Sequence, residues 1–177
     1  MKICSLIVGS TLLASVAFAQ PVVSAGGILN AASYALSELP NSGIAQGSMF
    51  VVFGSGLGPA TLTQITAFPL PLALADTSMK VAVNNVVRDV PMIYTSAQQV
   101  VGILPSNTPL GVATLTLTYN GKTSAPVAFN VVKSSVGIFA VNQKGTGPGV
   151  LQNFIGETDL PLNSVFKPAR PGQTMIL

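Results

Sequence analysis

The sequence contains no histidine and no tryptophan, and its single cysteine is Cys4. Charged residues make up only 7% of the 177 residues, against 49% hydrophobic residues. Histidine and cysteine are the usual protein ligands of transition metals, so their absence after Cys4 excludes most sites of that kind. The same absence removes the usual base for a nucleophilic serine and leaves no second cysteine for a disulfide. The composition therefore predicts no catalytic residue, no metal site and no cofactor, and a fold stabilised by a packed core.

The low charge argues against two further classes. Eight Lys and Arg residues against five Asp and Glu give a net charge of +3, and they are scattered along the chain. A nucleic-acid partner would need a basic cluster to neutralise phosphates, and none is present. A disordered chain would show the opposite balance of charge and hydrophobicity. We therefore expect a folded protein that does not bind nucleic acid.

The first nineteen residues predict an export signal. Lys2 provides a short positive start, residues 3–16 are apolar, and the small residues Ala17 and Ala19 form a cleavage site before Gln20. The alternative is a membrane span, but the apolar stretch is shorter than the ~20 residues that a bilayer requires. No basic cluster follows it either. We expect cleavage before Gln20, no membrane span afterwards, and a secreted or cell-surface location.

Beyond this signal the sequence favours an all-β protein. Short apolar segments rich in Val, Ile, Thr and Phe are separated by Gly, Pro, Asn and Ser, which is typical of a sandwich. One segment is almost wholly apolar, so we expect it to be buried on both faces. The expected strands are Met49–Phe53 (the wholly apolar one), Met79–Val83, Val86–Tyr94 with Pro91 at an edge or bulge, Val100–Leu104, Ala113–Tyr119 and Lys122–Val132. Ala31–Leu39 is expected to form a short helical turn.

Glycine and asparagine mark the expected turns. Asn120-Gly121 predicts a type I′ hairpin, because both central positions of that turn need positive φ. In the strand before it, apolar residues alternate with threonines, so one face should be buried and the other wet. Further structural turns are expected at Gly47, Gly54, Gly56 and Gly58.

An internal repeat predicts two units. Gln46–Val52 resembles Pro171–Leu177, and in both a glycine precedes a hydrophobic strand. We expect a lead segment at 20–42, a sandwich at 43–133 and a partial second β unit at 134–177. Because the second copy stops at Leu177 in mid-strand, we expect the chain to be a fragment of a longer protein or the product of a truncated gene.

Residues 43–132 resemble an IPT/TIG domain, which has an immunoglobulin-like fold. The segments that carry the resemblance are Gly47 with Gly54–Gly58, Val81–Asn85, Val100–Pro105, Gly111–Leu117 with Asn120-Gly121, and Ala128–Val131. The resemblance implies a β-sandwich.

A narrower resemblance covers nearly all of residues 20–177. It is to the Solibacter-type C-terminal domain family of secreted acidobacterial proteins, through Gly27–Tyr34, Ile93–Val100, Val136–Phe139 and Ala169–Gly172. The chain departs from that family at Ala97 and Val101, where proline and asparagine are typical, and it lacks a second Gly-x-Gly-Leu-Gly turn after Leu177. The family has no established activity; the resemblance implies a display, docking or interaction module.

Two groups of polar residues are candidate sites. Tyr94, Ser96, Gln98 and Gln99 combine an aromatic ring with hydrogen-bonding groups, which favours ligand contact; the alternative is a strand end followed by a polar loop. Glu157 and Asp159 are spaced for calcium binding or for acid–base hydrolysis; the alternative is a pair of solvated loop charges.

Three functions are consistent with these features. The first is a non-catalytic structural or protein-interaction module at the cell surface or in the extracellular space. The second is a carbohydrate-binding module associated with an extracellular hydrolase, with Tyr94 in contact with the sugar. The third is a hydrolase that uses Glu157 and Asp159.

Overall fold

A computed structural model describes residues 20–40 and 42–177, so Ala17 and Ala19 of the predicted cleavage site lie outside the described residues. The described residues form strands and no helix. The strands are β1 (Val22–Asn30), β2 (Ile44–Ala45), β3 (Met49–Ser55), β4 (Thr63–Gln64), β5 (Ala73–Leu74), β6 (Thr77–Val83), β7 (Val86–Asp89), β8 (Met92–Thr95), β9 (Gln99–Ile103), β10 (Gly111–Tyr119), β11 (Lys122–Thr123), β12 (Val127–Val132), β13 (Gln152–Asn153) and β14 (Met175–Ile176).

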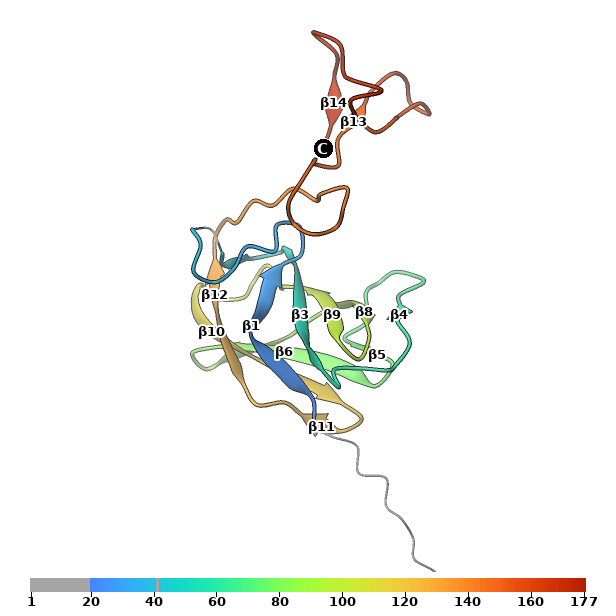
Figure 1. The fold of residues 1–177 in the computed structure, drawn as a ribbon. Coiled ribbons are helices and arrows are strands. Elements are labelled where there is room, and N and C mark those ends of the chain that lie inside the picture. The colour runs from blue at the N-terminus through green and yellow to red at the C-terminus, as the bar shows by residue number, and fades with distance from the viewer. Residues whose placement is uncertain (1–19, 41) are drawn as a thin grey trace, which may run out of the picture.

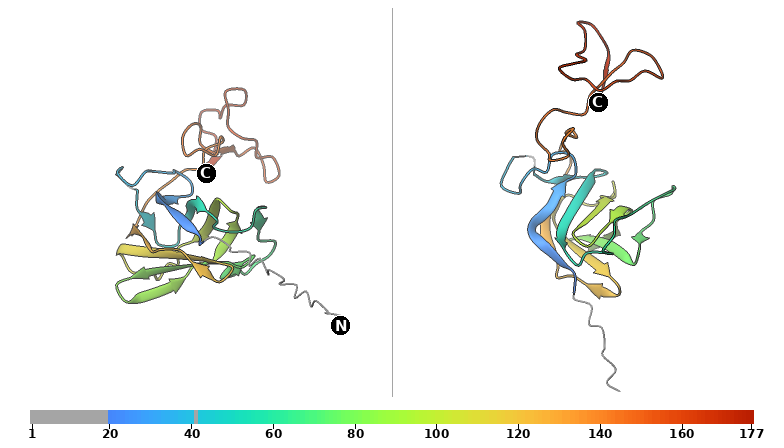
Figure 2. Two further views of the ribbon diagram at one scale, coloured as in Figure 1. Left: turned by 60° about the horizontal axis from the view of Figure 1, so that its bottom comes forward. Right: turned by 45° about the vertical axis from the view of Figure 1, so that its right-hand side comes forward.

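Twelve of these strands form two facing sheets (Figures 1 and 2). One sheet has the order β1-β3-β9-β8-β4; the other has the order β2-β12-β10-β6-β5, with β7 paired to β6 and β11 to β10. All pairs are antiparallel except β2–β12. The immunoglobulin fold divides seven strands between two sheets, four in one and three in the other. The same division is seen here, with β1, β3, β9 and β8 in one sheet and β6, β10 and β12 in the other. The predicted all-β, immunoglobulin-like sandwich is confirmed.

The core lies between the two sheets. Phe50 and Val52 face inward from β3, and Leu115 and Leu117 face inward from β10, all fully buried. The Phe50 ring stacks on that of Phe129 from β12, with centroids 6.4 Å apart. Each such side chain contributes roughly 1.5–3 kcal/mol through burial, so this core replaces the disulfide that the sequence lacks.

The predicted hairpin is present, with one interruption. Asn120 and Gly121 have φ values of 47° and 74°, as a type I′ turn requires. The expected single strand over Lys122–Val132 is instead divided, because Ser124 turns inward. Its hydroxyl accepts a hydrogen bond from the Leu117 N–H (3.0 Å), and its own N–H donates to the Leu117 carbonyl (2.7 Å).

The expected strand Val86–Tyr94 is two strands in different sheets. β7 pairs with β6, whereas β8 pairs with β9. Pro91 lies between them, where it cannot donate a ladder hydrogen bond, and its carbonyl accepts one from the Ile103 N–H (2.9 Å). The proline therefore marks the crossing from one sheet to the other rather than an edge within one strand.

The predicted lead segment, 20–42, contributes a strand to the sandwich. β1 pairs with β3 along the first sheet, with a bulge between Val23 and Ile28. The short helical turn expected over Ala31–Leu39 is replaced by two separate turns. In the first, the Tyr34 N–H donates to the Asn30 carbonyl (2.9 Å), and the positive φ of Tyr34 (49°) ends it; in the second, the Leu39 N–H donates to the Leu36 carbonyl (2.9 Å).

The four glycines predicted as turns serve two purposes. Gly47 and Gly56 have φ values of 75° and 62°, as a turn glycine does. Gly54 and Gly58 do not have positive φ. At Gly54 a Cβ atom would lie 2.1 Å from the Val22 carbonyl oxygen, and at Gly58 it would lie 2.2 Å from the Thr95 hydroxyl. These two glycines therefore permit close packing rather than a turn.

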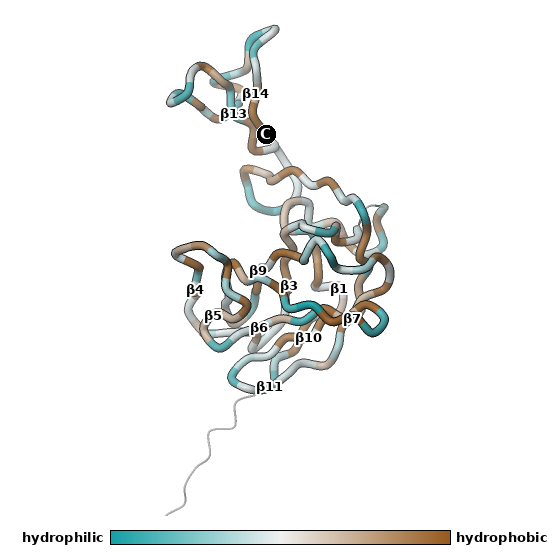
Figure 3. Tube along the Cα trace, turned by 180° about the vertical axis from the view of Figure 1, so that it is seen from behind, coloured by the Kyte–Doolittle hydropathy of each residue, from teal (hydrophilic) through white to brown (hydrophobic). Residues whose placement is uncertain are grey.

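The segment predicted as a second unit, residues 134–177, lies only partly apart from the sandwich: residues 139–150 pack against it, and residues 151–177 lie beyond one end of it (Figures 1 and 2). Its sheet consists of β13 and β14 alone. Large apolar side chains of this unit are exposed, among them Phe166 and Leu177. The hydropathy colouring of Figure 3 marks β14 as hydrophobic although it faces solvent.

Candidate binding pocket on the outer face of the first sheet

The outer face of the first sheet is apolar. Leu29, Val51 and Val101, from β1, β3 and β9, are buried there beside the partly buried rings of Tyr34 and Tyr94. The outer face of a sandwich sheet is ordinarily polar, because it meets solvent. The prediction that Met49–Phe53 is buried on both faces is confirmed for Phe50, Val51 and Val52, which are fully buried, whereas Met49 is 36% exposed and Phe53 is partly buried.

Residues 139–150 fold over this face as a narrow loop. The Val150 N–H donates to the Phe139 carbonyl (2.7 Å), and the Val141 N–H donates to the Pro148 carbonyl (2.9 Å). The tip of the loop touches the turn that follows β1, where a Cβ atom on Gly145 would lie 2.3 Å from the Ser33 carbonyl oxygen. The loop is therefore held against the sandwich by close backbone packing.

The buried Asn30 side chain fixes the base of this loop. Its amide donates to the Ser135 carbonyl (3.1 Å), and its oxygen accepts from the N–H groups of Ala32 (2.9 Å) and Ser33 (3.2 Å). One side chain thus turns the chain after β1 and also ties down the segment that leads into residues 139–150.

A pocket of about 380 Å³ lies between the loop and the sheet. That volume is within the range of small-ligand sites and is large enough for one or two side chains of a partner. Its wall is mainly apolar, with three polar groups. The apolar lining includes Met49, Val101, Phe139, Val141 and Val150, and the polar groups belong to Tyr34, Tyr94 and Gln143.

Tyr94 is the most constrained polar group of the pocket. Its hydroxyl accepts a hydrogen bond from the side-chain amide of Gln99. Burial raises the pKa of Tyr94 above 10.0, the proximity of Tyr34 raises it further, and the hydrogen bond from Gln99 acts in the opposite direction. The hydroxyl therefore stays protonated at neutral pH. Tyr34 is positioned by Phe53, with ring centroids 5.8 Å apart at an interplanar angle of 80°.

Of the four residues predicted to contact a ligand, two belong to the pocket or support it and two lie outside it. Tyr94 lines the pocket and Gln99 holds its hydroxyl. Ser96 closes a turn instead, because its hydroxyl donates to the Gln99 carbonyl (3.0 Å). Gln98 is exposed, and its carbonyl accepts a hydrogen bond from the Gly54 N–H (3.0 Å). Neither Ser96 nor Gln98 lines the pocket.

Sequence reasoning does not identify Tyr34, Phe139 and Val141 as members of this pocket. The sequence places Tyr34 in a helical turn, and Phe139 lies far away from it in the chain. One feature of the sequence could have indicated these residues. Phe139 and Val141 lie in an uncharged apolar stretch without the alternating pattern of a strand, so their apolar side chains need another surface to pack against.

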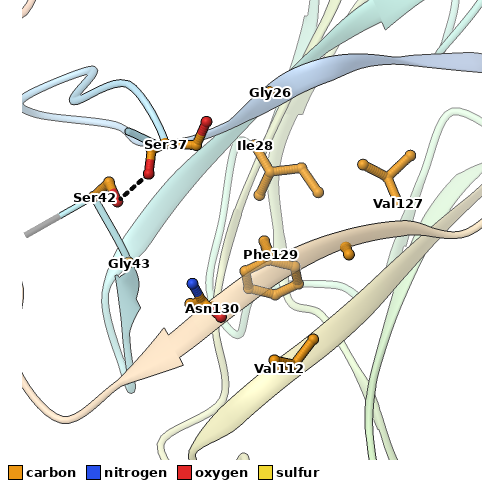
Figure 4. Close-up of a pocket in the computed structure, with 10 residues that line it drawn as sticks. Gly26, Ile28, Ser37, Ser42, Gly43, Val112, Val127, Phe129 and Asn130 are labelled. Carbon is orange, nitrogen blue, oxygen red and sulfur yellow. Dashed lines mark hydrogen bonds between the residues drawn. The ribbon is translucent and has the colours of Figure 1, made fainter. Parts of the chain in front are cut away.

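A second hollow, of about 200 Å³, opens between the edges of the two sheets. Figure 4 shows Ile28 of β1 and Phe129 of β12 facing each other across it. On the rim, the Ser42 hydroxyl donates to the Ser37 carbonyl (3.0 Å). It is about half as large as the first pocket, and no titratable side chain lines it.

Glu157 and Asp159 lie on a tight turn. The N–H groups of Ile155 and Gly156 both donate to the Asp159 carbonyl (3.2 and 3.3 Å). Within residues 20–40 and 42–177, no group of three or more His, Cys, Asp or Glu side chains is placed to hold a metal ion. In the same ranges, no helix is long and apolar enough to cross a membrane.

Comparisons with known proteins add little to this geometry. No family model matches the sequence, and no curated protein sequence matches it. Among solved structures, the filamin domain of Lin-41 is similar at 13% identity and a TM-score of 0.33, over 66% of this chain and 100% of that domain. The strand order itself defines the class of the protein, which is an all-β, immunoglobulin-like sandwich.

Proposed function

We propose that this protein is an exported, non-catalytic module that binds another protein at the cell surface or in the extracellular space. The observation that carries the proposal is the apolar pocket between the first sheet and residues 139–150. A hollow with apolar walls and a few fixed polar groups is the usual form of a small-ligand site, and at protein interfaces such a hollow holds an anchoring side chain of the partner.

The pocket suits an apolar or aromatic side chain of a partner. Phe139 and Val141 are about half exposed and give up water on binding. The Tyr94 hydroxyl, held by Gln99, and the Gln143 amide provide hydrogen bonds that fix the orientation of the partner. Tyrosine is enriched at such anchor points because it contributes a large contact area at low entropic cost.

Site-specific cross-linking tests this proposal. A photo-reactive amino acid replaces Val141 in the pocket or, as a matched control, Val87 on β7; the two side chains are 49% and 53% exposed. In the native organism we expect a discrete cross-linked protein from position 141 and none from position 87. The purified partner should then bind at least tenfold more weakly to Phe139→Ala than to wild type. Equal products from both positions, or unchanged affinity, contradict the proposal.

A carbohydrate-binding module is the second candidate. Two tyrosine rings and an amide line one pocket, and sugars stack on aromatic rings while their hydroxyls bond to amides. A glycan array separates the two candidates. Binding that is lost in Tyr94→Ala favours the sugar; an array with no signal rules it out.

We also propose that residues 1–19 are removed on export and that the sandwich is an IPT/TIG domain of the Solibacter-type C-terminal family. The close packing at Gly54 and Gly58 supports the second part, because it gives a physical reason for the glycine-rich segment on which the resemblance rests. The intact mass of the secreted protein tests export: we expect a chain that begins at Gln20, and a chain that retains Met1 contradicts cleavage.

A further inference from the structure

The second unit repeats the opening strand pair of the sandwich. In the first unit, β1 pairs with β3 so that Asn30 lies opposite Phe50. In the second unit, β13 pairs with β14 so that Asn153 lies opposite Met175. Phe50 follows Gly47 by three residues, and Met175 follows Gly172 by three; the two glycines have φ values of 75° and 77°.

The hydrogen bonds beside these pairs are equivalent. The Ala31 N–H donates to the Met49 carbonyl (3.2 Å), and the Phe154 N–H donates to the Thr174 carbonyl (3.0 Å). Both asparagines are buried and both bond to a distant carbonyl: Asn30 to Ser135 (3.1 Å) and Asn153 to Lys167 (2.8 Å). The correspondence therefore extends from the sequence pattern to register, to backbone conformation and to the bond that each asparagine amide donates; the Asn30 oxygen also accepts two bonds, whereas the Asn153 oxygen has no partner.

The two pairs differ in what lies beyond the second strand. β3 has a second neighbour, β9, in which Gly102 lies opposite Phe50. β14 pairs only with β13 within the part of the chain that the structure describes. In an antiparallel strand, the backbone groups of successive residues point alternately to the two edges. The Thr174 carbonyl bonds to Phe154, beside β13, so the N–H and C=O of the next residue, Met175, point to the opposite edge of β14. That edge is the one that β9 occupies on β3.

We propose that residues 151–177 are the first two strands of a second immunoglobulin-like unit, and that the open edge of β14 takes an antiparallel strand with the pattern of β9. The occupant is an extended, uncharged, β-branched segment with a small residue opposite Met175. Residues 171–177 carry no charge and no proline after Pro171, so nothing in this edge opposes pairing. The proposal goes beyond the function proposed above, because it uses none of the residues that line the pocket.

The β9 sequence itself supplies the probe. A fluorescent peptide with the sequence of residues 98–105, flanked by lysines for solubility, is titrated with the exported chain, Gln20–Leu177. Two further peptides carry backbone N-methyl groups. One is methylated at Val100 and Gly102, whose N–H groups face β3 in the sandwich. The other is methylated at Val101 and Ile103, whose N–H groups face away, as the Ile103 bond to Pro91 shows (2.9 Å).

We expect a saturable rise in anisotropy with the unmethylated peptide. Methylation at Val100 and Gly102 should weaken binding at least tenfold, and methylation at Val101 and Ile103 should change it less than threefold. A Met175→Pro variant, which lacks the N–H on the open edge, should also lose binding, while its sandwich keeps the wild-type thermal transition.

Three results would overturn the proposal. The first is no saturable binding of the unmethylated peptide. The second is equal weakening by the two methylation patterns, which would mean that no edge-specific ladder forms. The third is a protein that sediments as a dimer joined through β14 and is not dissociated by the peptide, which would make a second copy the occupant.

Discussion

Phe50 and Met175 hold the same place in two strand pairs but have different surroundings. Phe50 is fully buried, whereas Met175 is 38% exposed. The local elements are alike: a glycine with positive φ, an antiparallel pair and a buried asparagine opposite the apolar residue. The difference shows that local sequence is sufficient to set a strand pair, whereas burial of its apolar face requires a second sheet from elsewhere in the chain.

The largest difference in stability is expected when the side chains of Phe50 and Met175 are each truncated to alanine. We expect Phe50→Ala to lower the free energy of unfolding by about 3–5 kcal/mol, because it leaves a cavity between the sheets. Met175→Ala should cost less than about 1 kcal/mol, because no core surrounds it. Urea denaturation followed by circular dichroism measures both. Equal losses would mean that the second unit has a closed core.

The positions of most strands could be predicted from the sequence, because they depend on local signals. Alternating threonines and the Asn120-Gly121 turn predict the hairpin, and the structure has both. What the sequence does not indicate depends on contacts distant in the chain. The sequence predicts a lead segment at 20–42 and an edge or bulge at Pro91. In the structure β1 pairs within the first sheet and the chain changes sheet at Pro91, because both are set by strands distant in the chain.

The second test removes the two equivalent asparagines. Asn30→Ala leaves the N–H groups of Ala32 and Ser33 and the Ser135 carbonyl without that partner, so we expect a loss of about 2–3 kcal/mol. Asn153 donates one bond to Lys167, and its side-chain oxygen has no partner, so Asn153→Ala should cost about 1 kcal/mol or less. Thermal denaturation of the two variants under identical conditions makes the comparison; a larger loss at Asn153 would contradict it.

The third test concerns glycine. Gly54→Ala brings a Cβ atom against the Val22 carbonyl and should force β1 and β3 apart, at a cost of about 1–3 kcal/mol. Gly172→Ala meets no atom within 4 Å, and its cost of about 1–2 kcal/mol comes from positive φ alone. We expect Gly54→Ala to lower the melting temperature of the sandwich and Gly172→Ala to leave it unchanged. A shift of the sandwich in both variants would show that the two units unfold together.

The candidate site could be predicted only in part, for the same reason. Tyr94 stands out because polar residues surround it in sequence, and it does line the pocket. Ser96 and Gln98 are its neighbours in sequence, but one closes a turn and the other faces solvent. Phe139 and Val141 reach the pocket only because residues 139–150 fold back over the first sheet, and no spacing within the sequence encodes that contact.

The smallest effect is expected in the pH dependence of the stability of the protein, through the ionisation of Tyr94. Because its pKa is raised in the folded state, mainly by burial, the folded protein holds this proton more tightly than the unfolded chain does. The resulting contribution to stability is complete below pH 10.0 and is lost as the pH rises through the folded pKa. We expect Tyr94→Phe to weaken the loss of stability above pH 10.0, as measured by urea midpoints. Identical profiles for the two proteins would contradict this interpretation.

Hydrogen exchange of two backbone amides tests the comparison most directly. The Phe50 N–H is directed at β9 inside a complete sheet, and the Met175 N–H is directed at the open edge of β14. We expect the Phe50 amide to exchange only with global unfolding and the Met175 amide to exchange nearly as fast as in an unfolded peptide. If the Met175 amide is protected as strongly as that of Phe50, the edge of β14 is already paired, and the contrast between a closed first unit and an open second one is wrong.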